Sequence, residues 1–399
     1  MDQRFRQLFN AQFTPAIYEQ YTRELARRLN TNFEFRLAET PLFIPDDFKQ
    51  KAVESAQAIM EQLSDPALIE RMKAAIPERW NTPGMDALPN LAQVDFAVVR
   101  ENGVLVPKLI ELQGFPSLTA LQLVQRDVWM ETMAQLDGLD LAWSCWYSGY
   151  DREAFIDLAR RTIVGKQDPA EVILMDLDPL SQKTYPDFAA TKLLFDVDAV
   201  DPTTLVRRGK QLFRADGTPV RRIYNRVVFD ELIQKGVTLP FDYREELDVE
   251  WVPHPNWYWV WSKYSLPFLR HTSVPRATFV SELERIPDDL SGYVLKPLFS
   301  FAGGGVNIEP TRADIEAIPT SERHAWCLQE KIEYEPALQA ADGGGVKIEI
   351  RFMFLRPDDE PKPILAQNLV RLSRGKMLGV DFNKQFTWVG SSVGLSTDS

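Results

Sequence analysis

The chain has 399 residues, of which 45% are hydrophobic and 26% charged, so it can build two or three packed units and is not a disordered chain. Its formal net charge of −12 at pH 7 argues against nucleic-acid and anionic-membrane partners, because either would bind against the overall field. The N-terminus lacks a signal-peptide core and no apolar run approaches the ~20 residues that span a bilayer, which favours a cytoplasmic location.

Residues 1–85 are expected to form an N-terminal helical region. The segments FTPAIYEQYTRELARRL and DDFKQKAVESAQAIMEQL both place apolar residues at helical spacing. The second segment begins with Asp46 and Asp47, whose carboxylates suit the positive end of a helix dipole. We expect this region to serve as a scaffold or a lid.

Residues 86–250 alternate between β-type and helical runs. The β-type runs include VDFAVV, KLIELQGF, AEVILMDLD and VRRIYNRVVFDEL, and the helical runs include LTALQLVQRDVWMETMAQL and DREAFIDLARRTI. This alternation predicts an α/β domain with a mainly parallel sheet. The basic residues between Arg207 and Arg226 alternate around Asp216-Gly217 like a hairpin, which indicates a solvated strand face or a small-anion site.

Residues 251–399 contain β-type runs joined by glycine-rich connections. ADGGGVKIEIRFMFL is typical of a hairpin, and PILAQNLVRLSRGKMLGVDF of another strand pair. The predicted fold class is therefore α/β and α+β. Cys145 and Cys327 are expected to be buried thiols, and the three histidines show no zinc-ligand spacing.

The stretch YVLKPLFSFAGGGVNI places Lys296 near the end of a β-type run, with Gly303, Gly304 and Gly305 beginning seven residues later. A cation at a strand end, followed by a glycine loop, is one way to hold a triphosphate. The lysine neutralises phosphate oxygens, and bare backbone N–H groups close over them. A hairpin whose lysine reaches solvent explains the stretch equally well when it is considered alone.

Lys296 with its glycine loop is followed by WCLQEKIEYEP, KIEIRF and GVDFNK, and this order resembles that of the ATP-grasp superfamily over about residues 250–390. The resemblance implies an ATP-grasp architecture, with an α/β pre-ATP domain over 86–250 and a two-subdomain ATP clamp over 251–399. It also implies that two lysines contact the phosphates of ATP. These are Lys263, which precedes the subdomain, and Lys296 on its strand.

The run QEKI, with Gln329, Glu330 and Ile332, resembles the hinge whose backbone meets the adenine edge in this superfamily. On the same resemblance, Glu333 or Glu335 would reach a ribose hydroxyl. A solvated charge run at a strand end explains these residues equally well on sequence grounds.

Glu349 and Arg351 lie two residues apart in a predicted strand, so their side chains share one face. An exposed ion pair of this kind would contribute little to stability. The superfamily resemblance favours a functional reading, in which Arg351 and Lys296 are catalytic and hold the transferring phosphoryl group.

The run GVDFNK contains Asp381 and Asn383, which resemble the acid-x-Asn metal signature of the superfamily. Both offer hard oxygen donors of the kind that Mg²⁺ takes alongside phosphate. The superfamily usually has a further acid about a dozen residues upstream, where this chain has the neutral Asn368, and Glu349 would compensate for it. The expected Mg²⁺ ligands are Glu349, Asn368, Asp381 and Asn383.

A second resemblance concerns residues 94–125, which are similar to a region of glutathionylspermidine synthetase in which a strand ends in Glu-x-Asn-x-Asp-Thr-Pro. Glu111 and Pro116-Ser117 match that pattern, whereas Gln113 and Phe115 replace its Asn and Asp. The alternative for Glu111 is a buried, hydrogen-bonded acid at a strand end.

Together the resemblances imply an ATP-dependent carboxylate–amine ligase. ATP would phosphorylate a substrate carboxylate, and an amine would attack the acyl phosphate to give an amide, ADP and phosphate. The expected partners are small-molecule or peptide carboxylates and amines. Two alternatives stay open: an ATP-binding module that has lost turnover, and phosphoryl transfer to a hydroxyl.

Overall fold

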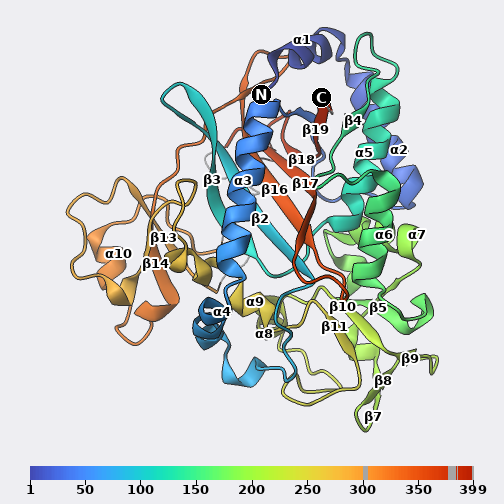
Figure 1. Cartoon of the computed structure of the whole chain (residues 1–399), viewed down its shortest axis with the longest axis vertical. Coiled ribbons are helices and arrows are strands. Elements are labelled where there is room, and N and C mark those ends of the chain that lie inside the picture. The colour runs from blue at the N-terminus through green and yellow to red at the C-terminus, as the bar shows by residue number, and fades with distance from the viewer. Residues whose placement is uncertain (300–303, 376–382, 384, 398–399) are drawn as a thin grey trace.

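The computed structural model describes residues 1–299, 304–375, 383 and 385–397. Its largest sheet is antiparallel and lies at the centre of the molecule (Figure 1). One further short strand, β15 (Leu338–Gln339), pairs with the start of β16. In spatial order the main strands are β18 (Gly390–Ser392), β17 (Ile364–Ser373), β16 (Gly345–Leu355), β2 (Leu91–Glu101) and β3 (Val104–Gln113).

The two faces of this central sheet differ in chemistry, because successive side chains of a strand point to opposite sides. Along β16, Ile350 and Phe352 point to one face and Glu349 and Arg351 to the other, and all four are buried. The apolar face packs under the long helix α3 (Asp46–Leu63), which lies across it in Figure 1. The other face carries a row of buried polar side chains.

The predicted N-terminal helices are confirmed. They are α1 (Gln3–Gln12), α2 (Pro15–Leu29), α3 and α4 (Pro66–Met72), and α3 opens with two aspartates in its first turn. Large aromatic residues join this region to α5 (Thr119–Met133), since the rings of Tyr21 and Trp129 stack with their centres 4.0 Å apart.

The expected parallel sheet is present, but it is smaller than the sequence predicted. It contains four strands, joined by helices α7 (Tyr185–Phe195) and α8 (Phe229–Lys235) and preceded by α6 (Arg152–Ile163). All of its pairings are parallel. In spatial order the strands are β11 (Glu250–Val252), β10 (Arg222–Asn225), β5 (Val172–Met175) and β6 (Asp198–Val200).

The prediction of a parallel arrangement was wrong for residues 91–113. These residues form the antiparallel hairpin β2–β3, whose two-residue turn, Asn102-Gly103, has positive φ angles of 50° and 81° at its two positions. Asn-Gly is the commonest signal for such a turn, because both residues tolerate the left-handed region. Pairing of β2 with β16 then joins segments that the sequence assigned to different domains.

A third sheet, antiparallel, is formed by β12 (Ala277–Phe279), β14 (Trp326–Glu330) and β13 (Tyr293–Pro297), and it stands beside the central sheet in Figure 1. The short helix α10 (Arg312–Glu316) packs on its outer face, where Leu295, Leu328 and Ile315 form a small core. The inner face carries Lys296 and Gln329, because these residues lie opposite Cys327 and Val294 in the register.

The remaining elements are short. The hairpin predicted around Asp216-Gly217 is confirmed, as is the one that enters β16. The sequence also predicted a strand pair in PILAQNLVRLSRGKMLGVDF. Its first strand is β17, and most of its second strand lies outside the described residues. The strands are β1 (Leu42–Phe43), β4 (Trp143–Ser144), β7 (Val206–Arg208), β8 (Gln211–Phe213), β9 (Pro219–Val220) and β19 (Gly394–Thr397); the helical turns are α9 (Trp257–Val260), η1 (Lys73–Ala75), η2 (Glu78–Trp80), η3 (Pro169–Glu171), η4 (Pro179–Ser181), η5 (Pro202–Thr204), η6 (Lys263–Phe268), η7 (Val280–Glu282) and η8 (Arg323–Ala325).

The whole is a mixed α/β fold with several sheets. Both cysteines are free thiols and buried, as the sequence predicted. Over the described part of the chain, no helix combines the length and the apolar character that crossing a bilayer requires.

Candidate functional site

The polar face of the central sheet is organised by two arginines around a fully buried carboxylate. Asp95 of β2 accepts hydrogen bonds from Arg351 Nε at 2.7 Å and Nη2 at 2.6 Å, and from Arg371 Nη2 at 2.6 Å. Burial alone would raise the pKa of Asp95, but the two guanidinium groups outweigh it and hold the pKa below its usual range. Asp95 is therefore an ionised anchor for both arginines.

Glu349 continues this cluster on β16. Arg371 bridges Glu349 and Asp95, and Tyr334 donates its hydroxyl to Glu349 Oε2 at 3.3 Å. Burial raises the pKa of Glu349 to about 7; Arg371 opposes the shift, whereas the charges of Asp95 and Glu111 add to it. The expectation that Glu349 and Arg351 share a face is confirmed, and that face is buried.

Lys296 connects the third sheet to the central one. Its Nζ donates to the backbone carbonyl of Ile110 in β3 at 3.2 Å, and the side chain is buried. Burial lowers the pKa of Lys296; the Cys327 thiol and the Glu111 carboxylate oppose the shift, and the positive charge of Lys263 adds to it. Two lysines and a carboxylate therefore lie within electrostatic range of one another between the two sheets.

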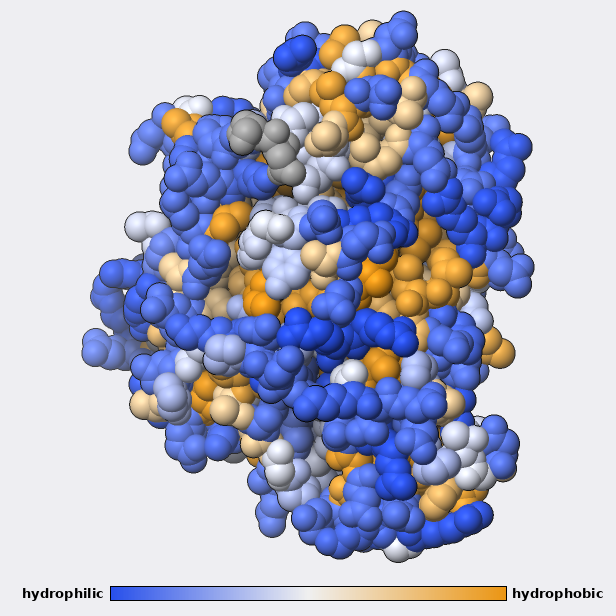
Figure 2. All heavy atoms as spheres, turned by 45° about the vertical axis from the view of Figure 1, so that its right-hand side comes forward, coloured by the Kyte–Doolittle hydropathy of each residue, from blue (hydrophilic) through white to orange (hydrophobic). Residues whose placement is uncertain are grey.

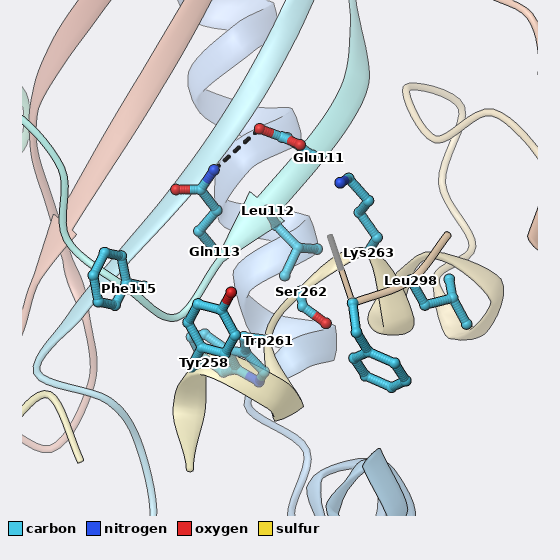
Figure 3. A pocket seen from close by; sticks show the side chains of 10 residues that line it. Glu111, Leu112, Gln113, Phe115, Tyr258, Trp261, Ser262, Lys263 and Leu298 are labelled. Atoms are coloured by element: carbon cyan, nitrogen blue, oxygen red, sulfur yellow. Dashed lines mark hydrogen bonds between the residues drawn. The ribbon is translucent and has the colours of Figure 1, made fainter. Parts of the chain in front are cut away.

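A pocket opens beside these groups (Figure 3). Figure 3 shows Lys263 pointing toward Glu111, with Tyr258 and Trp261 below them. The pocket is narrow and measures about 460 Å³ when the part open to solvent is counted. Gln113 Nε2 donates to Glu111 Oε1 at 3.0 Å, and Arg351 Nη2 lies 4.0 Å from that same oxygen. The lining residues are Glu111, Leu112, Gln113, Phe115, Tyr258, Trp261, Ser262, Lys263, Leu298 and Phe299.

The residues expected to meet the adenine divide into two groups. Gln329 is 1% exposed on the inner face of the third sheet, and neither atom of its amide has a hydrogen-bond partner among the described residues. Glu330 is exposed and accepts a bond from the backbone N–H of Arg276, while Glu335 pairs with Arg100. Ile332 is half-buried in the segment that leads away from β14. Gln329 alone shares a face with Lys296.

The glycine loop returns to the strand that it leaves. Leu295 and Asn307 exchange both backbone hydrogen bonds at 2.9 Å, so the two ends of the loop are paired. Gly304 and Gly305 are exposed; Gly305 has a φ of 70°, and a Cβ there would meet Pro297 Cγ at 3.1 Å. Gly303 lies outside the described residues.

Of the expected metal ligands, the structure describes Glu349, Asn368 and Asn383, and it places Glu349 and Asn368 on opposite faces of the central sheet. Asn368 lies three residues from Arg371 in β17 and therefore on the opposite face, where its amide bonds Tyr147 and Gly394. Asn383 uses its Oδ1 to accept bonds from Ser373 Oγ and two backbone N–H groups. Asp381 lies outside the described residues. Among the described residues, no group of three or more His, Cys, Asp and Glu side chains could hold a metal ion.

Asn383 is therefore expected to act as a structural acceptor. Replacing Asn383 with alanine removes the acceptor of three hydrogen bonds, which come from the Ser373 hydroxyl and the backbone N–H groups of Arg374 and Gly375, so we expect a loss of about 1–3 kcal/mol in the free energy of unfolding. Urea denaturation measures this loss. The exposed Asn32 provides the control, and an Asn383→Ala variant as stable as Asn32→Ala would contradict the assignment.

Three side chains of the cluster escaped the sequence reasoning: Asp95, Arg371 and Tyr334. Asp95 lies in an otherwise apolar run, VDFAVV, and a lone acid in a buried strand is a signal that it has a charged partner. Arg371 gave no comparable local signal, because its partners are set by the pairing of β17 with β16. Tyr334 gave none either, because it reaches Glu349 from the irregular segment between β14 and β15.

Gly114 fixes the distance between the central sheet and the segment that carries Lys263. Its N–H donates to Trp261 O at 2.6 Å, and a Cβ at this position would lie 2.6 Å from Trp257 O. We expect Gly114→Ala to displace that segment and to cost about 1–3 kcal/mol of stability, as overpacking does. Gly292→Ala is the control, because a Cβ there meets nothing within 4 Å. Equal urea midpoints for the two variants would show that the contact is unimportant.

The central and third sheets face each other, with lysines on one side and a carboxylate–arginine cluster on the other. The protein is therefore a mixed α/β protein with a polar cleft between these layers. No family model and no curated protein matches the sequence. A solved structure similar to this chain is a glutathione synthetase-like effector, GSS30, from Globodera pallida in its apo form. The TM-score is 0.57 at 14% identity, and the match covers 98% of this chain and 99% of that one. The chain thus shares the fold of this effector over almost its whole length.

Proposed function

We propose that the protein is an ATP-dependent ligase of the ATP-grasp type, which activates a carboxylate as an acyl phosphate and joins it to an amine. The observation that carries the proposal is the pair of buried lysines, Lys263 and Lys296, that converge beside Glu111 between two sheets. The similarity to a glutathione synthetase-like effector supports a ligase-like fold.

The charges of the cleft favour a polyanion such as the triphosphate of ATP. Phosphate oxygens would replace the Ile110 carbonyl as partners of Lys296 and would compensate its buried charge. Positive side chains outnumber carboxylates in the described cleft, so a bound anion would offset the excess positive charge. The four cations are Lys263, Lys296, Arg351 and Arg371, and the three carboxylates are those of Asp95, Glu111 and Glu349.

The base of ATP has a candidate partner in Gln329. A buried amide without partners costs free energy, and an adenine edge offers both a donor and an acceptor to satisfy it. The aromatic walls of the pocket, among them Tyr258 and Trp261, suit a flat ring.

The fit is poor for Mg²⁺. The carboxylate of Glu349 is engaged by Arg371 and Tyr334, and the side chains of Asn368 and Asn383 are used in bonds of their own. We therefore assign no step of the reaction to the metal. In the proposed reaction Lys263 and Lys296 orient the phosphates, and Arg351, held by Asp95, keeps positive charge on the polar face of the central sheet.

A second candidate is an ATP-binding module without turnover. The bridge that Arg371 makes between Asp95 and Glu349 favours it, because these two carboxylates are then occupied by a guanidinium. Phosphoryl transfer to a hydroxyl, the third possibility raised by the sequence, has no specific observation in its favour.

Product analysis separates these functions. The protein is incubated with ATP, Mg²⁺ and a panel of amino acids, small peptides and amines, and ADP and free phosphate are measured together. A ligase releases both in equal amounts when an acid and an amine are supplied, whereas transfer to a hydroxyl gives ADP without phosphate. Binding of ATP without any product would support the module, and absence of ATP binding would refute both proposals.

A further inference from the structure

A second and larger groove lies away from the pocket described above and shares no residue with it. It runs along α7 and the edge strand β6, between η4 and the C-terminal end of α2. It measures about 1200 Å³, counting the part open to solvent. The lining residues are Leu29, Asn30, Asp178, Pro179, Leu180, Tyr185, Phe188, Ala189, Lys192, Asp198, Ala199 and Asp201.

The walls of this groove combine apolar and polar side chains. Leu29 and Phe188 form buried parts of the wall, while Leu180 is 75% exposed at the rim. Figure 2 brings forward the side of the molecule that carries α2 and α7, and apolar atoms gather there among hydrophilic ones. Leu29, Phe188 and Leu180 therefore offer apolar contacts to a ligand in the groove.

One side of the groove is a strand edge. β6 is the last strand of its sheet and pairs only with β5 among the described strands. An edge strand offers backbone donors and acceptors that an extended peptide can use by adding as a further strand. This geometry suits an extended peptide better than a compact metabolite.

The charge at the rim is negative. Lys192, the only cation in the lining, is paired with Asp196 at 2.6 Å and Asp198 at 2.9 Å. Among the described residues, the donors to Asp201 are neutral groups of Thr203 and the backbone of Asp178, so no cation in this part of the chain is seen to pair with it. The carboxylate of Asp178 is exposed at the same rim. The net charge of −12 adds a long-range attraction for cations.

We propose that this groove binds an extended basic peptide segment of a partner protein. The segment adds along β6, places alternate apolar side chains against Leu29 and Phe188, and directs lysine or arginine side chains to Asp178 and Asp201. The interaction does not involve the cleft of the proposed ligase site, so it holds whether or not the chain turns over ATP.

The test uses a fluorescent nonapeptide in which Lys and Leu alternate, with a Glu/Leu peptide of the same length for comparison. Fluorescence anisotropy measures binding to the full chain and to a double variant, Asp178→Asn with Leu180→Ser. We expect the double variant to bind the Lys/Leu peptide about tenfold more weakly, since two contacts of about 0.7 kcal/mol each are removed. Both positions are exposed, so the fold is expected to persist.

Leu193→Ser is the matched control, because Leu193 is 57% exposed on the same helix α7 but does not line the groove. This variant and Lys296→Met should bind the peptide as the parent does. Hydrogen exchange should show protection over residues 198–200 in the complex. Equal affinity of the parent and the double variant, equal binding of the Glu/Leu peptide, or protection elsewhere would overturn the proposal. Hexylamine carries an amine and an apolar chain but no peptide backbone. If the protein binds hexylamine and neither peptide, the proposal of a peptide ligand is overturned as well.

Discussion

Replacing Lys296 with methionine is expected to abolish the thermal stabilisation that ATP gives to the parent chain. Methionine keeps the apolar stem of the buried side chain but removes the cation that we assign to the phosphates. At ATP concentrations near 100 times the dissociation constant, the parent should gain about 2.7 kcal/mol, and the variant close to none. Thermal denaturation with and without ATP measures the difference.

The control for this experiment is Lys362→Met, since Lys362 is exposed in the connection between β16 and β17 and does not line the pocket. A Lys296→Met variant that ATP stabilises as much as the control would remove Lys296 from the site. The dependence on pH provides a second readout. Because the pKa of Lys296 is lowered in the folded chain, affinity for ATP should fall as the pH rises through that lowered value, and Lys296→Met should lack this fall.

Replacing Arg371 with methionine is expected to cause the largest loss of stability among the site variants. The side chain bridges Asp95 and Glu349, both nearly inaccessible to solvent, and its removal leaves Glu349 without a guanidinium partner. Breaking a buried pair in this way costs about 3–5 kcal/mol. Urea denaturation of the parent and the variant at neutral pH measures the loss.

The sign of the pH dependence identifies the cause. The pKa of Glu349 is raised in the folded chain, so its protonated form stabilises the fold at low pH, and this contribution is lost as the pH rises toward 7. Without Arg371 the pKa of Glu349 should rise further. The Arg371→Met variant should therefore lose more stability than the parent as the pH rises from 5.5 to 8.

Two further variants complete the test. Arg374→Met is the control, because Arg374 pairs with the partly exposed Asp342 and should contribute little. Adding Glu349→Gln to Arg371→Met should restore part of the stability at pH 8 by removing the unpaired charge. If Arg371→Met is as stable as Arg374→Met, the bridge that Arg371 makes between Asp95 and Glu349 does not stabilise the fold.

The sequence by itself determined the elements whose signals are local. The helices α2 and α3 follow from apolar residues repeated at 3.6-residue spacing, and the acidic start of α3 follows from the helix dipole. The common face of Glu349 and Arg351 follows from the two-residue period of a strand. Lys296 could also be identified from the sequence as a candidate site residue, because a cation in an apolar strand is unusual wherever the strand lies.

Only the tertiary structure decided which of these residues meet. Asp95 and Arg351 are 256 residues apart, and their pairing depends on the register of β2 against β16. The same register places Arg371 beside Glu349 and turns Asn368 to the opposite face, so Asn368 is separated from Glu349. The physical reason is that a strand's own residues fix how its side chains alternate, whereas its partner, its direction and its register depend on contacts distant in sequence.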